Sequence, residues 1–262
     1  MELHGKLAVV TGGTRGVGAG IARALAAAGA EVLVCARRPP EVSLPGTEFV
    51  PLDVRDADAV RRTVDALPRL DVLVNNAGGA PHRPFTGPDP GHHLRVLELN
   101  LLAPLTVSLA AHAHLRRARG SVVMIGSVGG TRPSPGTAAY GAAKAGLEHL
   151  ARSMAVEWAP EVRVNTLVVG MVRTERAHLH YGDAEGLAAV ARTVPLGRLA
   201  DPADIGAATV FLASDAAAYV SGASLHVHGG GERPAFLTAA TTTGTRDRAV
   251  PEGEREGEGK SR

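Results

Sequence analysis

Short apolar segments alternate along most of the chain with longer segments that are apolar on one face. The short segments predict strands at residues 7–11, 31–36, 48–52, 72–75, 121–125, 162–169 and 224–227. The longer segments predict helices at residues 17–28, 57–67, 92–117, 138–158 and 202–213. Because strands and helices alternate, the pattern predicts right-handed βαβ units and an α/β fold with one doubly wound parallel sheet, covered by helices on both faces.

The same pattern predicts one domain over residues 1–237, because no Pro/Gly-rich linker separates two apolar cores. Residues 171–198 lie between the sixth strand and the last helix and contain several glycines, so they are a candidate mobile lid over a substrate. Residues 238–262 are rich in Thr, Gly, Glu and Arg and poor in apolar residues, which predicts a disordered tail.

Composition narrows the class of protein. In 262 residues, 45% are hydrophobic and 21% are charged, which is typical of a soluble globular protein. A net charge of +2 and 3% aromatic residues argue against a nucleic-acid-binding module. The single cysteine, Cys35, indicates a reducing compartment. No signal peptide is recognisable and no apolar run approaches about 18 residues, so we expect a cytoplasmic protein without a membrane partner.

A glycine-rich loop follows the first predicted strand and opens the first predicted helix. Glycines let the backbone approach a pyrophosphate closely, and the free N–H groups at a helix start favour an anion. The alternative is an ordinary tight turn, but the strand before it and the helix after it favour a dinucleotide site on a Rossmann-like fold. The candidate binding residues of the loop are Gly12, Thr14, Arg15, Gly16, Val17 and Gly18.

Three further residues point to acid–base chemistry. Tyr140 and Lys144 are four apart on a predicted helix, so both project from one face. A neighbouring ammonium lowers the pKa of a phenol, which predicts a usable acid and base, although such pairs are also common on ordinary helix surfaces. Ser127 follows the fifth strand, at the sheet edge where ligands bind, and its hydroxyl suits a substrate oxygen; otherwise it caps a loop or helix.

Taken together, the glycine loop, Asn75-Asn76-Ala77-Gly78, Asn100, Ser127 and Tyr140-x-x-x-Lys144 resemble the short-chain dehydrogenase/reductase family, similar in layout to 3-oxoacyl-carrier-protein reductases. The resemblance extends from residue 3 to about residue 230. It implies hydride transfer between a nicotinamide dinucleotide and a carbonyl or alcohol, with Tyr140 as the acid and base and Lys144 also contacting the nicotinamide ribose.

The resemblance implies further roles. Asn100 would hold a water that relays protons through Lys144; alternatively its amide bends the helix or is satisfied in the core. Asp53 and Val54 would contact the adenine, although an Asp there could also cap the next helix. The remaining implied cofactor contacts are Asn76, Ala77 and Gly78 near the adenosine half, and Val172 and Thr174 near the nicotinamide amide.

The end of the second strand bears on the choice of dinucleotide. An Asp or Glu there would select NAD(H), whereas an Arg accommodates the 2′-phosphate of NADP(H). The chain has Arg37 and Arg38 at this point and no acid, and Arg15 adds a guanidinium on the same side. These residues predict NADP(H) in preference to NAD(H); the alternative is that Arg37 and Arg38 are merely solvated.

Two positions depart from the family pattern. Val169 stands where a proline usually precedes the glycine, and His228 stands where an acid often precedes the last glycine pair. His226 and His228 share a strand face, but no third ligand is evident, so we predict no metal site.

No cluster of fixed charge marks a polyanionic substrate, so we expect a small or medium, neutral carbonyl or alcohol. Long Ala-rich helices at 91–117 and 138–158 predict a homotetramer or homodimer. A non-catalytic NADP(H)-binding regulator or redox sensor on the same fold is the alternative function.

Overall fold

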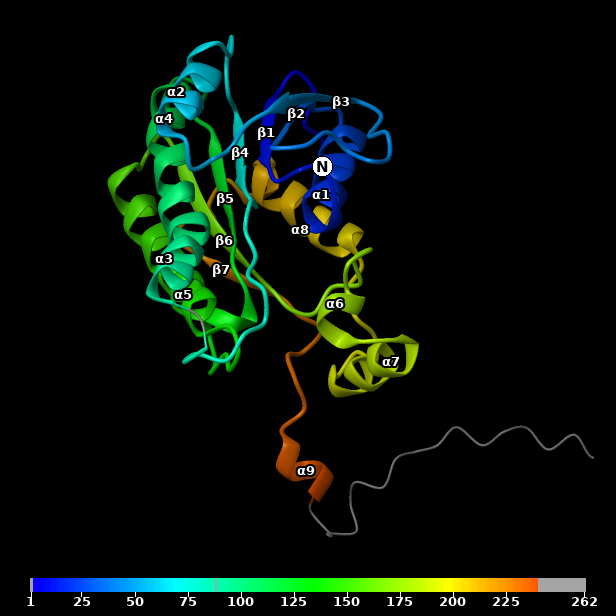
Figure 1. Ribbon diagram of the computed structural model, residues 1–262. Coiled ribbons are helices and arrows are strands. Elements are labelled where there is room, and N and C mark those ends of the chain that lie inside the picture. The colour runs from blue at the N-terminus through cyan, green and yellow to red at the C-terminus, as the bar shows by residue number, and fades with distance from the viewer. Residues whose placement is uncertain (1, 88, 240–262) are drawn as a thin grey trace, which may run out of the picture.

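The computed structural model describes residues 2–87 and 89–239. Within these residues all strands form one parallel sheet in the order β3-β2-β1-β4-β5-β6-β7 (Figure 1). The strands are β1 Leu7–Thr11, β2 Glu31–Ala36, β3 Thr47–Pro51, β4 Val72–Asn75, β5 Ser121–Ile125, β6 Arg163–Val169 and β7 Ser224–Val227. The prediction of a doubly wound parallel sheet is therefore confirmed, with each strand within one residue of its predicted bounds.

The predicted helices are also present, with one interruption. The helices are α1 Gly16–Ala27, α2 Ala57–Asp65, α3 Pro90–Leu97, α4 Ala103–Ala118, α5 Ala138–Glu157, α6 His178–Tyr181, α7 Ala184–Thr193, α8 Pro202–Ala213 and α9 Ala235–Ala239. The segment predicted as one helix at 92–117 is α3 and α4 joined by a π-helical turn, Glu98–Leu102. Such turns occur mostly as single insertions in α-helices, frequently at functional sites. The helices α6, α7 and α9 were not predicted.

The sheet is buried on both faces, with α2, α4 and α5 on one side and α1 and α8 on the other (Figure 1). Successive strand residues point to opposite faces, so Leu73 and Val122 enter the core under α4 and α5. Their neighbours Val74 and Val123 enter the core under α1 and α8. This burial on two sides explains why the strands are apolar throughout rather than alternating.

The continuous helical stretch Pro90–Ala118 corrects one expectation. By length and composition it is able to cross a membrane, contrary to the prediction that no segment approaches a span. Core helices of globular proteins pass the same test, and α4 packs Val107, Ala111 and Leu115 into the core against the sheet.

The carboxyl ends of the strands bring the predicted motifs to one edge of the sheet. The order of strands reverses between β1 and β4, and ligands of such sheets bind in the crevice at that point. The helices α6 and α7 extend beyond this edge (Figure 1). The predicted tail begins too early, because residues 238 and 239 complete α9; its remainder, 240–262, lies outside the described residues.

Candidate functional site

The glycine loop passes closely over the start of α1. Gly12 has a φ of 65°, and a Cβ there would lie 2.9 Å from the Cα of Ala77. A Cβ at Gly18 would lie 2.3 Å from the carbonyl oxygen of Gly12. Only glycine therefore fits these two positions, and the loop keeps the compact form that a close approach to a diphosphate requires.

The loop after β4 braces the glycine loop. The side-chain amide of Asn76 donates to the carbonyl oxygens of Thr11, at 2.9 Å, and Gly12, at 3.0 Å. The backbone N–H groups of Asn76 and Ala77 donate to the Thr11 hydroxyl at 3.0 and 3.1 Å. Asn75 donates to Ser108 of α4 at 2.9 Å. Both amide protons of Asn76 are thus used to hold the loop, a role that its motif alone did not reveal.

The start of α1 meets residues from the segment after β6. The backbone N–H of Gly16 donates to Oε1 of Glu175 at 3.0 Å. A Cβ at Gly16 would lie 3.4 Å from the side chain of Thr174. Arg15, the N-cap residue of α1, makes no side-chain cap bond, so the carboxylate satisfies an otherwise free amide at the positive end of the helix. The structure therefore brings Thr174 and Glu175 against the glycine loop, whereas the sequence placed Thr174 only near the nicotinamide amide.

Arg37 and Asp53 lie close together at the edge next to β2 and β3. The pKa of Asp53 is lowered to about 2, chiefly by hydrogen bonds from Arg55, with a smaller contribution from the charge of Arg37. The Asp53 carboxylate accepts from Nε of Arg55 at 2.9 Å and from its Nη2 at 2.6 Å. The cap of α2 is Asp56, which excludes the capping interpretation of Asp53. Val54 is buried in the core.

Ser127, Tyr140 and Lys144 come together where β5 ends and α5 begins. The Ser127 hydroxyl accepts from the N–H of Gly129 at 3.1 Å, so it also caps the short helical turn Val128–Gly130. A Cβ at Gly129 would lie 3.4 Å from the Ser127 Oγ and 3.6 Å from Cε1 of Tyr140. The Lys144 Nζ lies 5.5 Å from the centre of the Tyr140 ring.

Burial shifts the two titratable members of this group in opposite directions. It raises the pKa of Tyr140, and a hydrogen bond with Ser127 opposes the shift without cancelling it. It lowers the pKa of Lys144 to about 8. The pKa of Tyr140 is shifted upward, contrary to the prediction that Lys144 lowers it. The ammonium donates to the carbonyl oxygen of Ile125 at 2.7 Å, and desolvation of the phenol dominates.

Asn100 is fully buried in the π-helical turn and reaches this group from the other side. Its Oδ1 accepts from the N–H of Gly79 at 2.8 Å, and its Nδ2 donates to the carbonyl oxygens of Gly79 and Val96 at 3.0 and 2.9 Å. A Cβ at Gly78 would lie 2.6 Å from Oδ1 of Asn100 and 3.5 Å from Nζ of Lys144. The Asn100 amide therefore has hydrogen-bond partners within the protein, as the alternative of a core amide predicted. These bonds hold the loop at Gly79 beside Lys144.

The segment predicted as a lid contributes a second tyrosine. Burial raises the pKa of Tyr181 at the end of α6, and the neighbouring Tyr140 and Glu232 raise it further, while Arg132 lowers it. Arg132 and Glu232 form an ion pair. No motif marked Arg132 or Glu232 in the sequence. A parallel bridge between Val172 and Ala200 joins the two ends of the segment predicted as a lid.

The two positions that depart from the family pattern lie at the carboxyl ends of the neighbouring strands β6 and β7. Val169 ends β6 opposite Val227. A Cβ at Gly170 would lie 2.7 Å from the Cβ of His228, so the glycine accommodates the histidine. The rings of His226 and His228 are 4.9 Å apart, and burial lowers the pKa of His228. No cluster of three or more metal-ligating side chains occurs among residues 2–87 and 89–239.

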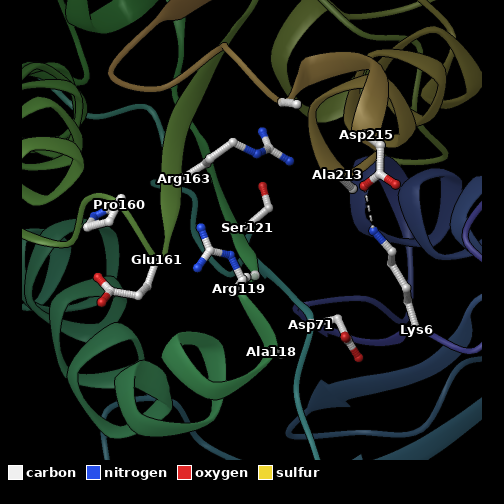
Figure 2. Close-up of a pocket in the computed structure, with 12 residues that line it drawn as sticks. Lys6, Asp71, Ala118, Arg119, Ser121, Pro160, Glu161, Arg163, Ala213 and Asp215 are labelled. Atoms are coloured by element: carbon white, nitrogen blue, oxygen red, sulfur yellow. Dashed lines mark hydrogen bonds and ion pairs between the residues drawn. The ribbon is translucent and has the colours of Figure 1, made fainter.

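A cavity of about 330 Å³ lies at the opposite edge of the sheet, by the amino ends of β5 and β6 (Figure 2). Lys6 and Asp215 form an ion pair there at 3.1 Å. Arg163 donates to the carbonyl oxygens of Val220 and Ser214 at 3.4 and 3.3 Å. Its lining includes none of the acid–base residues, so this cavity is separate from the candidate site.

Comparisons with known proteins agree with the geometry. A family model described as enoyl-(acyl carrier protein) reductase matches residues 12–232. L-fucose dehydrogenase of Oryctolagus cuniculus is 38% identical over 87% of this chain and 85% of its own length. The 3-oxoacyl-[acyl-carrier-protein] reductase of Escherichia coli is 34% identical over 88% of this chain and 98% of its own.

A solved structure from Beutenbergia cavernae, which contains NADP at low occupancy, is 35% identical, covers 87% of this chain and 97% of its own, and superposes with a TM-score of 0.80. The parallel sheet order agrees with the Rossmann-like fold of these relatives. The chain is thus an oxidoreductase that acts on an alcohol or carbonyl group and belongs to the short-chain dehydrogenase/reductase family.

Proposed function

We propose that the protein is an NADP(H)-dependent oxidoreductase for small or medium alcohols and carbonyls, with Tyr140 as its acid and base. The observation that carries this proposal is the proximity of Ser127, Tyr140 and Lys144, at the same sheet edge as the glycine loop. A non-catalytic binding protein would have no use for a serine–tyrosine–lysine group at the same sheet edge as the cofactor loop.

The residues present fit a dinucleotide. The glycine loop supplies backbone N–H groups, and the Gly16 N–H already donates to the Glu175 carboxylate, which supports an anion site there. Arg37 would hold the 2′-phosphate of NADP(H), and no carboxylate side chain stands at the end of β2 to select NAD(H). NADP in the structure from Beutenbergia cavernae supports this preference. When bound, the nicotinamide supplies or accepts the hydride at the substrate carbon.

The side chains around the substrate oxygen would move the proton that this oxygen gains or loses. In reduction, the Tyr140 phenol donates a proton to the substrate oxygen, which the Ser127 hydroxyl holds. Because burial raises the pKa of Tyr140, the phenol keeps its proton at neutral pH and is ready for the reductive direction. In oxidation, the same oxygen must lose that proton first, so the rate of oxidation should rise with pH.

The names of the relatives suggest two substrate classes. One relative is named a sugar dehydrogenase and another an acyl-carrier-protein reductase. We propose a cytoplasmic enzyme that acts on a neutral substrate of one of these classes and assembles as a homotetramer or homodimer.

The test is a panel of L-fucose, other aldoses, simple alcohols and ketones, and a 3-oxoacyl thioester, followed by NADPH absorbance. Turnover of at least one member with NADP(H) supports the proposal. A protein that binds NADP(H) in titration but turns over nothing in either direction is the regulator or redox sensor instead. A protein that turns over substrate better with NAD(H) overturns the cofactor assignment.

A further inference from the structure

Two charged residues face each other at the mouth of the site. Arg132 lies in the loop between β5 and α5, five residues after Ser127. Glu232 lies in the segment after β7, and its carboxylate hydrogen-bonds Nη2 of Arg132. The two partners are 100 residues apart in the chain, so the pair joins two separate walls of the site.

The wall that carries Arg132 is the catalytic one. It includes Ser127 and the first turn of α5, and Ser134 and Thr137 share a hydrogen bond of 2.7 Å between their hydroxyls. A Cβ at Gly129 would lie 3.3 Å from the Ser134 hydroxyl and 3.6 Å from the Tyr140 ring, so this loop folds back against the acid–base group.

The wall that carries Glu232 is hydrogen-bonded to the segment predicted as a lid, residues 171–198. The N–H of Arg233 donates to the carbonyl oxygen of Thr193 at the end of α7, at 2.8 Å. The N–H of Leu196 donates to the carbonyl oxygen of Gly229 at 3.1 Å. The segment of Glu232 is therefore fixed to the predicted lid, and the ion pair joins it to the loop that follows Ser127.

Both residues of the pair keep hydrogen-bonding groups that the chain does not use. The Arg132 guanidinium has five N–H groups; one donates to Glu232 and one donates to the carbonyl oxygen of Pro133 at 3.2 Å. The other Glu232 oxygen has no hydrogen-bond partner within the described part of the chain. The Arg132 and Glu232 side chains are 44% and 35% exposed, so a bound molecule can reach both. Tyr181 adds a hydroxyl, and its pKa responds to both charges and to Tyr140.

We propose that Arg132 and Glu232 are specificity-determining residues that recognise the hydroxyl groups of a polyhydroxylated substrate, an aldose or a related polyol. A carboxylate oxygen accepts hydrogen bonds from substrate hydroxyls, and the guanidinium donates to their oxygens or to a ring oxygen. An acyl chain would cover the unused N–H groups of Arg132 and the second carboxylate oxygen of Glu232 without offering them hydrogen bonds, which costs affinity. This inference rests on the proposed function and names the substrate class of the same site.

The test compares three variants with the parent: Glu232→Gln, Arg132→Met, and the double exchange Arg132→Glu with Glu232→Arg. The matched control is Asp215→Asn, which removes a carboxylate from an exposed ion pair at the opposite sheet edge. Steady-state kcat and KM are measured for a panel of aldopentoses and aldohexoses, for cyclohexanol, and for acetoacetyl-CoA.

The parent should turn over at least one aldose with a higher kcat/KM than cyclohexanol or acetoacetyl-CoA. Glu232→Gln and Arg132→Met should raise the KM for that aldose about tenfold or more, as expected for lost charge-assisted bonds, with kcat within a few-fold. The kcat/KM for cyclohexanol should stay within about twofold. The Asp215→Asn control should leave kcat and KM unchanged for both the aldose and cyclohexanol.

The exchange variant separates recognition from a mechanical latch. It keeps an ion pair between the two walls but exchanges the positions of the donor and the acceptor. If the pair recognises the substrate, the KM for the aldose should therefore stay as high as in the single variants. Recovery, or an equal loss on aldose and cyclohexanol, overturns the proposal in favour of a latch. A parent that prefers acetoacetyl-CoA overturns the substrate class but leaves the oxidoreductase function standing, whereas a parent inactive on every substrate overturns both.

Discussion

At the scale of single residues, the site depends on what burial does to Tyr140 and Lys144. Replacing Tyr140 by Phe keeps the ring in its packed position but removes the group that exchanges a proton with the substrate oxygen. We expect Tyr140→Phe to lower single-turnover hydride transfer by about 10²–10⁴-fold, with NADP(H) affinity within a few-fold of the parent. Retention of more than about a tenth of the parent rate would rule out Tyr140 as the acid and base.

Lys144 gives a prediction about stability and pH. In the folded protein its pKa is lowered from 10.5 to about 8 by burial, so between these values the unfolded chain binds more protons. The free energy of unfolding should therefore rise with pH across this window, by up to about 2 kcal/mol between about pH 8 and pH 9.5. Lys144→Met lacks the titrating group and should not show this rise.

Urea unfolding at about pH 7.5 and about pH 9.5 measures the difference. Ser127→Ala serves as a control, because it leaves Lys144 in place and should retain the rise. Parallel pH dependence of the parent and of Lys144→Met would contradict the lowered pKa of Lys144.

Arg37 tests the choice of cofactor. The Arg37→Asp substitution removes a charge-assisted bond to the 2′-phosphate and adds repulsion. NADP(H) should therefore bind at least about tenfold more weakly, whereas NAD(H) should change little. Binding titrations need no substrate. The control is Arg61→Asp on α2, an exposed arginine whose ion-pair partner is Asp58. Equal affinity of the parent for the two cofactors would refute the assignment.

At the scale of elements, the glycine loop and the lid segment meet through Glu175. Its carboxylate lies on the Gly16 amide, where we expect the diphosphate, so cofactor binding must displace it against like-charge repulsion. Glu175→Gln should bind NADP(H) about two- to five-fold more tightly, a gain that shrinks at high salt. Glu185→Gln, in the first turn of α7, removes the same charge elsewhere in the lid. An equal gain in both variants would show a general charge effect rather than this contact.

The strands and the long helices were predictable because each has its own periodic pattern, and most boundaries agree within two residues. The π-helical turn was not predictable, because Asn100, which lies in this turn, forms hydrogen bonds with Gly79, a residue 21 positions away in the chain. The helix α6 is a single turn too short to show periodicity.

The candidate site shows the same limit. Ser127, Tyr140 and Lys144 belong to a motif with fixed spacing, so the sequence located them. The contact between Gly16 and Glu175 spans 159 residues, and the pair of Arg132 and Glu232 spans 100, so no local pattern announces either. The direction of the Tyr140 pKa shift depends on burial, which only the packed structure supplies.

At the scale of the whole molecule, the exposed face of the helical stretch Pro90–Ala118 bears on assembly. Leu94, Leu102 and Leu109 are 64%, 51% and 60% exposed and are spaced seven or eight residues apart, so they form one apolar stripe. Val156 on α5 is 79% exposed. These are the two helices that the sequence marked as pairing surfaces, and a two-fold axis would bring each stripe against its copy.

The parent should therefore be a multiple of the 26.9 kDa chain by light scattering at micromolar concentration. Burial of a leucine contributes about 1.5–3 kcal/mol, and a two-fold interface buries each residue twice. The double substitution of Leu102 and Leu109 by Glu should therefore remove several kcal/mol of association free energy and shift the protein to smaller species. Val42→Glu, which changes an exposed residue between β2 and β3, should leave the mass unchanged. A parent that is already monomeric would show that this stripe does not pair, and an unchanged mass in the double variant would place the interface on another face.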